Sequence, residues 1–293
     1  MRLAPFRLHR PETVEQATDL LAELGSAAAL YSGGTELLLV AKMGLTDFTD
    51  LVDVKRIEEL GGITANGGLR IGAAVSHREI EHSLVVRDQW PSLATMERHV
   101  GNIRVRNVGT IGGNLCFADP HSDPATYLSA VGAHLVARCG GEAPREIPVE
   151  GFTRGPYRNT LAPGELLVSI EVPAPAPGSA VVHRKMSFRE RPAITVAANV
   201  TVQGGTISAA RLAVGSIGVA PLRLPTAERV LGGVEVTAAQ RELLSEFAHA
   251  AANEDQPVAD ANGSIDYKRQ LVRVLAARCA REAITLAHER AVD

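Results

Sequence analysis

The chain reads Ser32-Gly33-Gly34-Thr35-Glu36 at the first of two glycine doublets and Gly109-Thr110-Ile111-Gly112-Gly113-Asn114 at the second, about 75 residues later. Glycine lacks the Cβ atom that would keep an anion away from the backbone, and it tolerates positive φ, so several N–H groups can approach a pyrophosphate. The first doublet also precedes an apolar segment, residues 36–42, that we expect to be a helix, and the free N–H groups at a helix start favour an anion. The alternative is that both doublets are ordinary tight turns.

Other nucleotide-binding and catalytic motifs are missing. No two of the 27 glycines are separated by one residue, so the G-x-G-x-x-G dinucleotide fingerprint does not occur. None of the four lysines follows a glycine, which excludes the Walker A pattern. H-E-x-x-H and G-x-S-x-G are absent as well. We therefore expect neither a standard Rossmann domain nor a catalytic triad, and we assign no catalytic residue.

Composition excludes several classes of partner. The 293 residues carry 30 Lys plus Arg against 33 Asp plus Glu, a formal net charge of −3, which makes nucleic acid or an anionic membrane surface a poor expectation. No apolar run approaches the roughly 18 to 20 residues of a membrane span. The first residues lack the continuous apolar stretch of a secretory signal, so we expect a cytoplasmic protein with the 45 % hydrophobic content of a globular fold.

The cysteines form no metal motif. Cys116, Cys139 and Cys279 lie far apart, and there is no C-x-x-C pair, so the sequence predicts no zinc or iron–sulfur site in this chain. We expect reduced, mostly buried thiols and no metal ligands.

Periodicity and turn residues outline the elements. They predict a helix over 11–24, a strand over 27–31, a hairpin at Asn66-Gly67, a helix opening at Ser122 and a strand over 166–172. The proline-rich stretch 173–178 is the best candidate for a domain boundary. Beyond it we expect strands over 196–202 and 211–215 and two helices, the first after a capping box at Thr237-x-x-Gln240 and the second after Ser264.

Four stretches together carry a family resemblance. They are Tyr31-Ser-Gly-Gly-Thr-Glu-Leu-Leu38, Arg106-Asn-Val-Gly-Thr-Ile-Gly-Gly-Asn-Leu115, Ala118-Asp-Pro-His-Ser-Asp123 and Leu161-Ala-Pro-Gly-Glu-Leu-Leu167. In this order they closely resemble the FAD-binding medium subunits of the molybdenum hydroxylases, which include the flavoprotein subunits of carbon monoxide dehydrogenase and of bacterial xanthine dehydrogenases. The resemblance covers nearly the whole chain.

The resemblance implies an α+β fold. It predicts a PCMH-type (vanillyl-alcohol-oxidase-like) FAD-binding fold of two α/β subdomains, followed by a C-terminal α+β domain with a sheet and helices. The expected bounds are 1–56 and 57–173 for the two FAD-binding subdomains and 174–293 for the C-terminal domain.

The resemblance also assigns cofactor-binding residues. Both glycine loops hold the FAD pyrophosphate, Asp123 hydrogen-bonds the adenosine half, and Leu167 lies beside the flavin. Lys185 falls where related proteins place a basic residue near the isoalloxazine, the alternative being a surface lysine. Glu36 brings a negative charge to the phosphate-binding helix end, so its carboxylate must point away or meet an arginine such as Arg104 or Arg106. The loop residues carried over are Ser32, Gly33, Gly34, Thr35, Glu36, Leu37, Thr110, Ile111, Gly112, Gly113 and Asn114.

The function implied is electron transfer. In this family a large subunit holds the molybdenum cofactor and a small subunit holds two [2Fe-2S] clusters, which deliver electrons to noncovalently bound FAD for transfer to an external acceptor. We expect both partner subunits, in a dimer of heterotrimers. Two alternatives stay open: a stand-alone FAD-dependent oxidase or dehydrogenase, which usually has more than the roughly 115 residues found here beyond the linker, and a non-enzymatic nucleotide-binding module.

Overall fold

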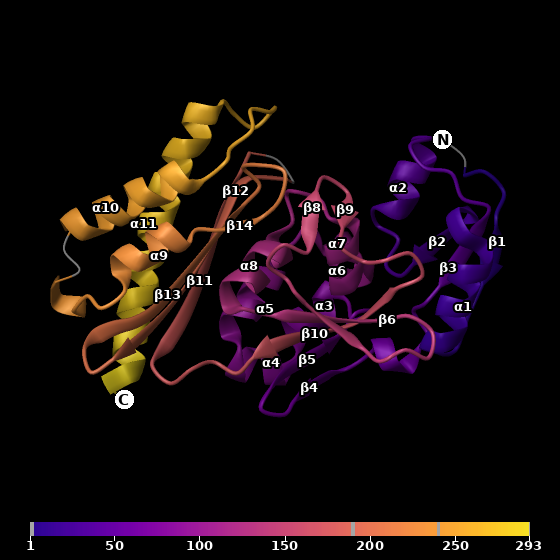
Figure 1. Ribbon diagram of the computed structural model, residues 1–293, viewed down its shortest axis with the longest axis horizontal. Coiled ribbons are helices and arrows are strands. Elements are labelled where there is room, and N and C mark those ends of the chain that lie inside the picture. The colour runs from indigo at the N-terminus through magenta and orange to yellow at the C-terminus, as the bar shows by residue number, and fades with distance from the viewer. Residues whose placement is uncertain (1–2, 189–190, 239–240, 293) are drawn as a thin grey trace.

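The computed structural model describes residues 3–188, 191–238 and 241–292. Its first unit is a parallel sheet of order β1-β3-β2 with two helices (Figure 1). Helix α1 begins after Thr13, whose side-chain oxygen accepts a hydrogen bond from the Gln16 N–H and so caps the first turn. The elements are β1 (Arg7–His9), α1 (Val14–Leu24), β2 (Ala28–Tyr31), α2 (Leu37–Lys42) and β3 (Asp50–Asp53), with a 3-10 turn at Gly25–Ala27.

The second unit contains an antiparallel sheet of order β4-β5-β10-β6-β7, covered by short helices. Its strands are β4 (Ile63–Ala65), β5 (Gly68–Gly72), β6 (His134–Arg138), β7 (Arg145–Pro148) and β10 (Leu166–Pro173), with β8 (Thr153–Gly155) and β9 (Arg158–Asn159) as a separate hairpin. Its helices are α3 (His77–His82), α4 (Leu84–Gln89), α5 (Pro91–Glu97), α6 (Ile103–Val108), α7 (Ile111–Phe117) and α8 (Asp123–Val131), with a 3-10 turn at Glu58–Leu60.

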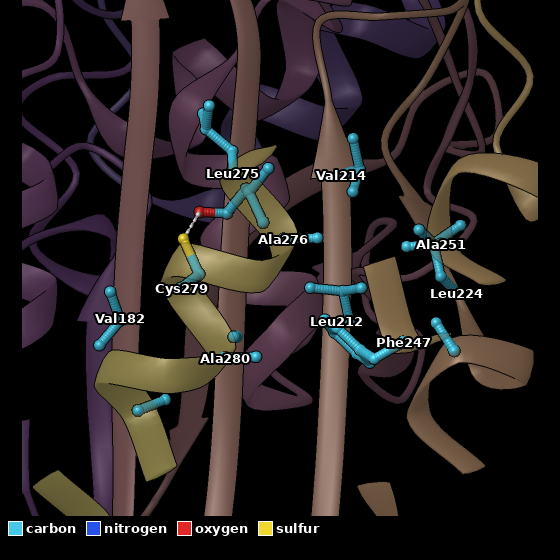
Figure 2. Packing of buried hydrophobic residues seen from close by; sticks show 14 of the residues in the cluster. Val182, Leu212, Val214, Leu224, Phe247, Ala251, Leu275, Ala276, Cys279 and Ala280 are labelled. Atoms are coloured by element: carbon cyan, nitrogen blue, oxygen red, sulfur yellow. Dashed lines mark hydrogen bonds between the residues drawn. The ribbon is translucent and has the colours of Figure 1, made fainter. Parts of the chain in front are cut away.

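The third unit is an antiparallel sheet of order β11-β12-β13-β14 with helices α9 to α11 on one face (Figure 1). Figure 2 shows its core, in which Leu212 and Phe247 pack together and the Cys279 thiol donates to the Val196 carbonyl oxygen at 3.8 Å. The elements are β11 (Ser179–Ser187), β12 (Pro192–Gln203), β13 (Thr206–Gly215), β14 (Leu222–Arg223), α9 (Pro225–Leu231), α10 (Arg241–Glu254) and α11 (Ile265–Val292), with a 3-10 turn at Val236–Ala238.

Helix α8 lies against the other face of this third sheet. Small side chains allow a close approach, because Ala130 of α8 packs with Ala197 and Ala213 in a buried cluster. The Thr195 hydroxyl of β12 also donates to the Thr126 hydroxyl of α8 at 2.8 Å. This close packing fixes the C-terminal sheet on the second unit, so residues near the ends of β11 and β12 reach the loops of the first two units.

The expected α+β class is confirmed, and so are the main elements. The Asn66-Gly67 hairpin joins β4 to β5, and Ser122 caps α8 by accepting a hydrogen bond from the Ala125 N–H. Gln240 of the expected capping box lies outside the described residues, although α10 does follow it. No helix in the described ranges is long and apolar enough to cross a membrane.

Candidate functional site

The two glycine loops meet face to face. A Cβ atom on Gly33 would overlap the Val108 carbonyl oxygen and lie 2.6 Å from the Gly109 Cα, so the first loop can touch the second only through glycine. The Thr110 hydroxyl donates to the Ser32 hydroxyl at 3.1 Å across the contact. Between the loops is a cavity of about 400 Å³ that all six predicted first-loop residues line. This volume is in the range of small-molecule and cofactor sites.

The first loop presents free backbone donors. Within the described residues, no hydrogen bond is made by the N–H groups of Gly33, Gly34, Thr35 or Glu36. Gly34 has φ +70°, a left-handed conformation that glycine adopts without strain. Consecutive unpaired amides beside a cavity are what an anion requires. This loop therefore fits the pyrophosphate of a dinucleotide.

The second loop is different, because its amides are already bonded. The Ile111 N–H donates to the Val75 carbonyl and the Gly112 N–H to the Ala73 carbonyl, both at 3.0 Å, while the Gly113 N–H donates to the Thr110 hydroxyl at 3.1 Å. Thr110, Gly112, Gly113 and Asn114 line the cavity, but Ile111 is fully buried in the core of the second unit. The second loop thus offers side chains and a Cβ-free surface rather than free amides.

Apolar residues form another part of the cavity wall. Leu167 lies there as predicted, together with its neighbour Leu166 from β10 and Leu30 from β2. Cys116 also lines the cavity, and burial raises the pKa of its thiol to about 12, so it is a neutral, apolar group at physiological pH. Such a wall suits a flat aromatic ring system.

Sequence reasoning missed a histidine in the cavity wall. His77, the first residue of α3, lines the cavity, and its Nδ1 lies 2.6 Å from Glu97 Oε2 with both side chains buried. The partners are 20 residues apart on different helices, so no local pattern in the sequence indicates the pair.

Asp123 and Lys185 do not line the cavity but pair with each other. Lys185 Nζ lies 2.6 Å from Asp123 Oδ2 and donates to the His99 carbonyl at 2.6 Å. Burial raises the pKa of the Asp123 carboxyl, and the nearby ammonium opposes that shift. The pair joins α8 to β11, and the contacts of both residues with FAD stay predictions.

The charge of Glu36 meets an arginine that the sequence analysis did not name. Glu36 Oε2 lies 3.7 Å from Arg191 Nη2, whereas Arg106 Nε pairs with Glu81 Oε2 at 3.1 Å. Glu36 thus meets an arginine, one of the two outcomes expected, but the arginine is Arg191 rather than the examples Arg104 and Arg106. Arg104 and Arg106 belong to the second unit, whereas Arg191 directly precedes β12 of the third unit.

Residues 4–175 match the family model described as "FAD binding domain in molybdopterin dehydrogenase". The chain belongs to this family. Residues 186–283 match a second model, described as "CO dehydrogenase flavoprotein C-terminal domain". The first match therefore contains both glycine loops, and the second contains strands β12, β13 and β14 of the third sheet and the end of β11.

Relatives match over nearly their full length. The carbon monoxide dehydrogenase medium chain of Hydrogenophaga pseudoflava is 32 % identical over 281 residues, 95 % of this chain and 96 % of that protein. The xanthine dehydrogenase FAD-binding subunit of Escherichia coli O157:H7 is 28 % identical over 286 residues, with the same coverage of each chain. A solved structure of the Hydrogenophaga pseudoflava carbon monoxide dehydrogenase superposes with a TM-score of 0.93 over 98 % of this chain and 99 % of that one.

Proposed function

We propose that this chain binds one FAD noncovalently between the glycine loops and is the electron-transferring medium subunit of a cytoplasmic molybdenum hydroxylase complex. The observation that carries the proposal is the row of unpaired first-loop amides facing a cavity lined by Thr110, Gly113 and Asn114. Matches along both family models support it. The chemistry that bound FAD supplies is the acceptance and onward transfer of electrons.

The chain's own residues hold and shield the cofactor. The amides of Gly34 and Thr35 would donate to the pyrophosphate, and the Ser32 hydroxyl, which accepts a hydrogen bond from Thr110, would donate one more. The wall around Leu167 would exclude water from the ring system. We retain Asp123 as the proposed adenosine contact and Lys185 as the proposed isoalloxazine neighbour.

The proposed domain bounds follow the division of the fold into three units. They are 1–56, 57–173 and 174–293, and the support for them is that each range contains one complete sheet, with the proline-rich stretch between β10 and β11.

Acid precipitation of the purified chain should release FAD at one per chain. The loops hold a dinucleotide pyrophosphate without any covalent attachment in this proposal, so the flavin should remain in the supernatant. The measurement is chromatography of the supernatant against FAD and FMN standards. Colour retained in the precipitate would contradict noncovalent binding, and released FMN would contradict the pyrophosphate assignment.

The partner subunits should dock beside the cavity. Relatives named medium chains and subunits belong to multi-subunit enzymes, and we propose a small [2Fe-2S] subunit and a large molybdopterin subunit in a dimer of heterotrimers. Helix α2 starts at the cavity with Leu37 and buries none of its residues, although most are apolar. We define the α2 surface as Leu39 of the helix together with Met43 and Leu45 just after it. These residues are 50 %, 53 % and 69 % exposed.

The double variant Leu39→Glu, Met43→Glu should lose its partners and keep its FAD. Burying an unpaired charge in an apolar interface costs on the order of several kcal/mol. Neither Leu39 nor Met43 lines the cavity, so FAD binding should be kept. The measurement is the subunit stoichiometry recovered with a tagged chain that is expressed with its genomic neighbours. Leu84→Glu is the control, because Leu84 is an 80 % exposed apolar residue at the start of α4. Wild-type stoichiometry in the double variant would exclude the α2 surface.

A further inference from the structure

Arg191 reaches from the C-terminal domain to the rim of the cavity. It directly precedes β12, within the range that matches the carbon monoxide dehydrogenase flavoprotein domain. Its Nη1 lies 3.0 Å from Asp119 Oδ2, and its Nη2 lies 3.7 Å from Glu36 Oε2. One guanidinium therefore bridges the first glycine loop and the loop that follows α7.

Glu36 is a difficulty for any anionic ligand in this cavity. It lines the cavity directly before α2, next to the free amides of Gly34 and Thr35. An ionised carboxylate there repels a pyrophosphate and competes with it for the same positive helix end. Partial burial raises the pKa of Glu36, and Arg191 opposes the shift. The arginine thus favours the ionised form of Glu36 and offsets its negative charge.

Arg191 is anchored independently of Glu36. Its other partner, Asp119, has an exposed fraction of only 14 % and accepts a 3.0 Å hydrogen bond from the His121 N–H. His121 Nδ1 lies 3.1 Å from Asp119 Oδ1, and its Nε2 lies 3.6 Å from Asp260 Oδ2. Asp260 in turn pairs at 2.8 Å with the buried Lys268. This series of polar contacts continues into α11, so the C-terminal domain and the loop after α7 hold the guanidinium in place.

We propose that Arg191 is a positioning residue for the dinucleotide site. It neutralises Glu36, so the first glycine loop accepts a pyrophosphate, and FAD retention thereby depends on the C-terminal domain. The inference rests on the proposed FAD function. The alternative is that the guanidinium contacts the pyrophosphate directly. The test below distinguishes this direct contact from an effect through Glu36.

The test is the FAD dissociation constant of four proteins, measured by titrating FAD into the deflavinated chain and following flavin fluorescence. Arg191→Gln should raise the dissociation constant about threefold to tenfold, the size expected for a partly exposed charge pair. Glu36→Gln should lower it about twofold, because repulsion disappears while Arg191 remains. The dissociation constant of the double variant should return to within about twofold of the wild-type value, because without Glu36 there is no negative charge for Arg191 to neutralise.

Two further variants serve as controls. Arg191→Lys keeps the charge and should recover most of the affinity. Arg184→Gln removes an arginine of β11 that pairs with Glu282 and should leave FAD binding unchanged. Thermal melts of the deflavinated proteins report any loss of folding separately from binding.

Three results would overturn the inference. An unchanged dissociation constant in Arg191→Gln would mean that Arg191 has no role in the site. A double variant as weak as Arg191→Gln would mean that the guanidinium contacts FAD directly rather than through Glu36. A wild-type chain that binds no FAD would instead refute the proposed function on which the inference rests.

Discussion

Gly33→Ala should abolish FAD binding and destabilise the fold together. The added methyl group would overlap the Val108 carbonyl oxygen, and backbone atoms cannot move aside as a flexible side chain can. Overpacking of this kind costs about 3 kcal/mol or more where neighbouring atoms belong to the main chain. The two loops would have to separate, which opens the cavity. The measurements are FAD content after purification and the free energy of unfolding in urea.

Substitutions at two other glycines serve as comparisons for Gly33→Ala. A Cβ on Gly141 meets nothing within 4 Å, so Gly141→Ala should behave as the wild type. A Cβ on Gly113 meets only the Thr110 hydroxyl, at 2.8 Å, so Gly113→Val should remain folded and still lose most of its FAD, because the branched side chain occupies the cofactor's space. Stoichiometric FAD in Gly33→Ala with unchanged unfolding would show that the loops are not in contact in solution.

The parts of the fold that could be predicted are those with strong local signals. Asn66-Gly67 is a tight turn and Ser122 is a helix cap, and each marks an element boundary through its own backbone chemistry. The alternating segments 196–202 and 211–215 predicted parts of the long strands β12 and β13. The glycine doublets were candidate anion-binding loops because glycine lets backbone N–H groups approach an anion, and the structure brings both loops to one cavity. That they hold a pyrophosphate stays a prediction.

The helices over 77–117 were not predicted, for a physical reason. Helices α3, α4, α5, α6 and α7 have six or seven residues each, too few for a 3.6-residue period to become visible. Their stability comes from packing against the sheet rather than from propensity. His77 and Glu97 lie on two of these helices, and their contact depends on that packing.

Ion pairs between residues far apart in the sequence could not be predicted either. The sequence shows that Glu36 needs a cation, but it does not show which of many arginines the fold brings near. Arg191 is 155 positions away and reaches Glu36 only because the third sheet packs on α8 through small residues. The same packing brings Lys185 to Asp123, where the resemblance suggested two separate contacts with FAD.

Lys185→Met should destabilise the chain by about 3 kcal/mol at neutral pH, since removing one partner of a buried ion pair leaves the other charge uncompensated. The Asp123 side chain is 4 % exposed, and the nearest remaining group, His183 Nε2, is 3.9 Å away. Burial lowers the pKa of His183 to about 3, so this imidazole is neutral and cannot replace the ammonium. For a chain of this length the melting temperature should fall by roughly 6 to 12 °C. Urea unfolding of both proteins provides the measurement.

The pH dependence and a second substitution distinguish an ion pair from a flavin contact. Burial already raises the pKa of Asp123, and losing Lys185 raises it further. When a carboxyl binds its proton more tightly in the folded state, the protein loses stability as pH rises above the unfolded pKa of about 4. The stability that Lys185→Met loses relative to the wild type should therefore grow from pH 4 towards neutrality.

Adding Asp123→Asn to Lys185→Met removes the uncompensated buried charge and should restore roughly half of the lost stability. A cation that also lies beside the isoalloxazine has a separate signature, because its removal would lower the flavin midpoint potential by roughly 20 to 45 mV. Since Asp123 already neutralises the ammonium at 2.6 Å, we expect the loss of stability to be the larger effect.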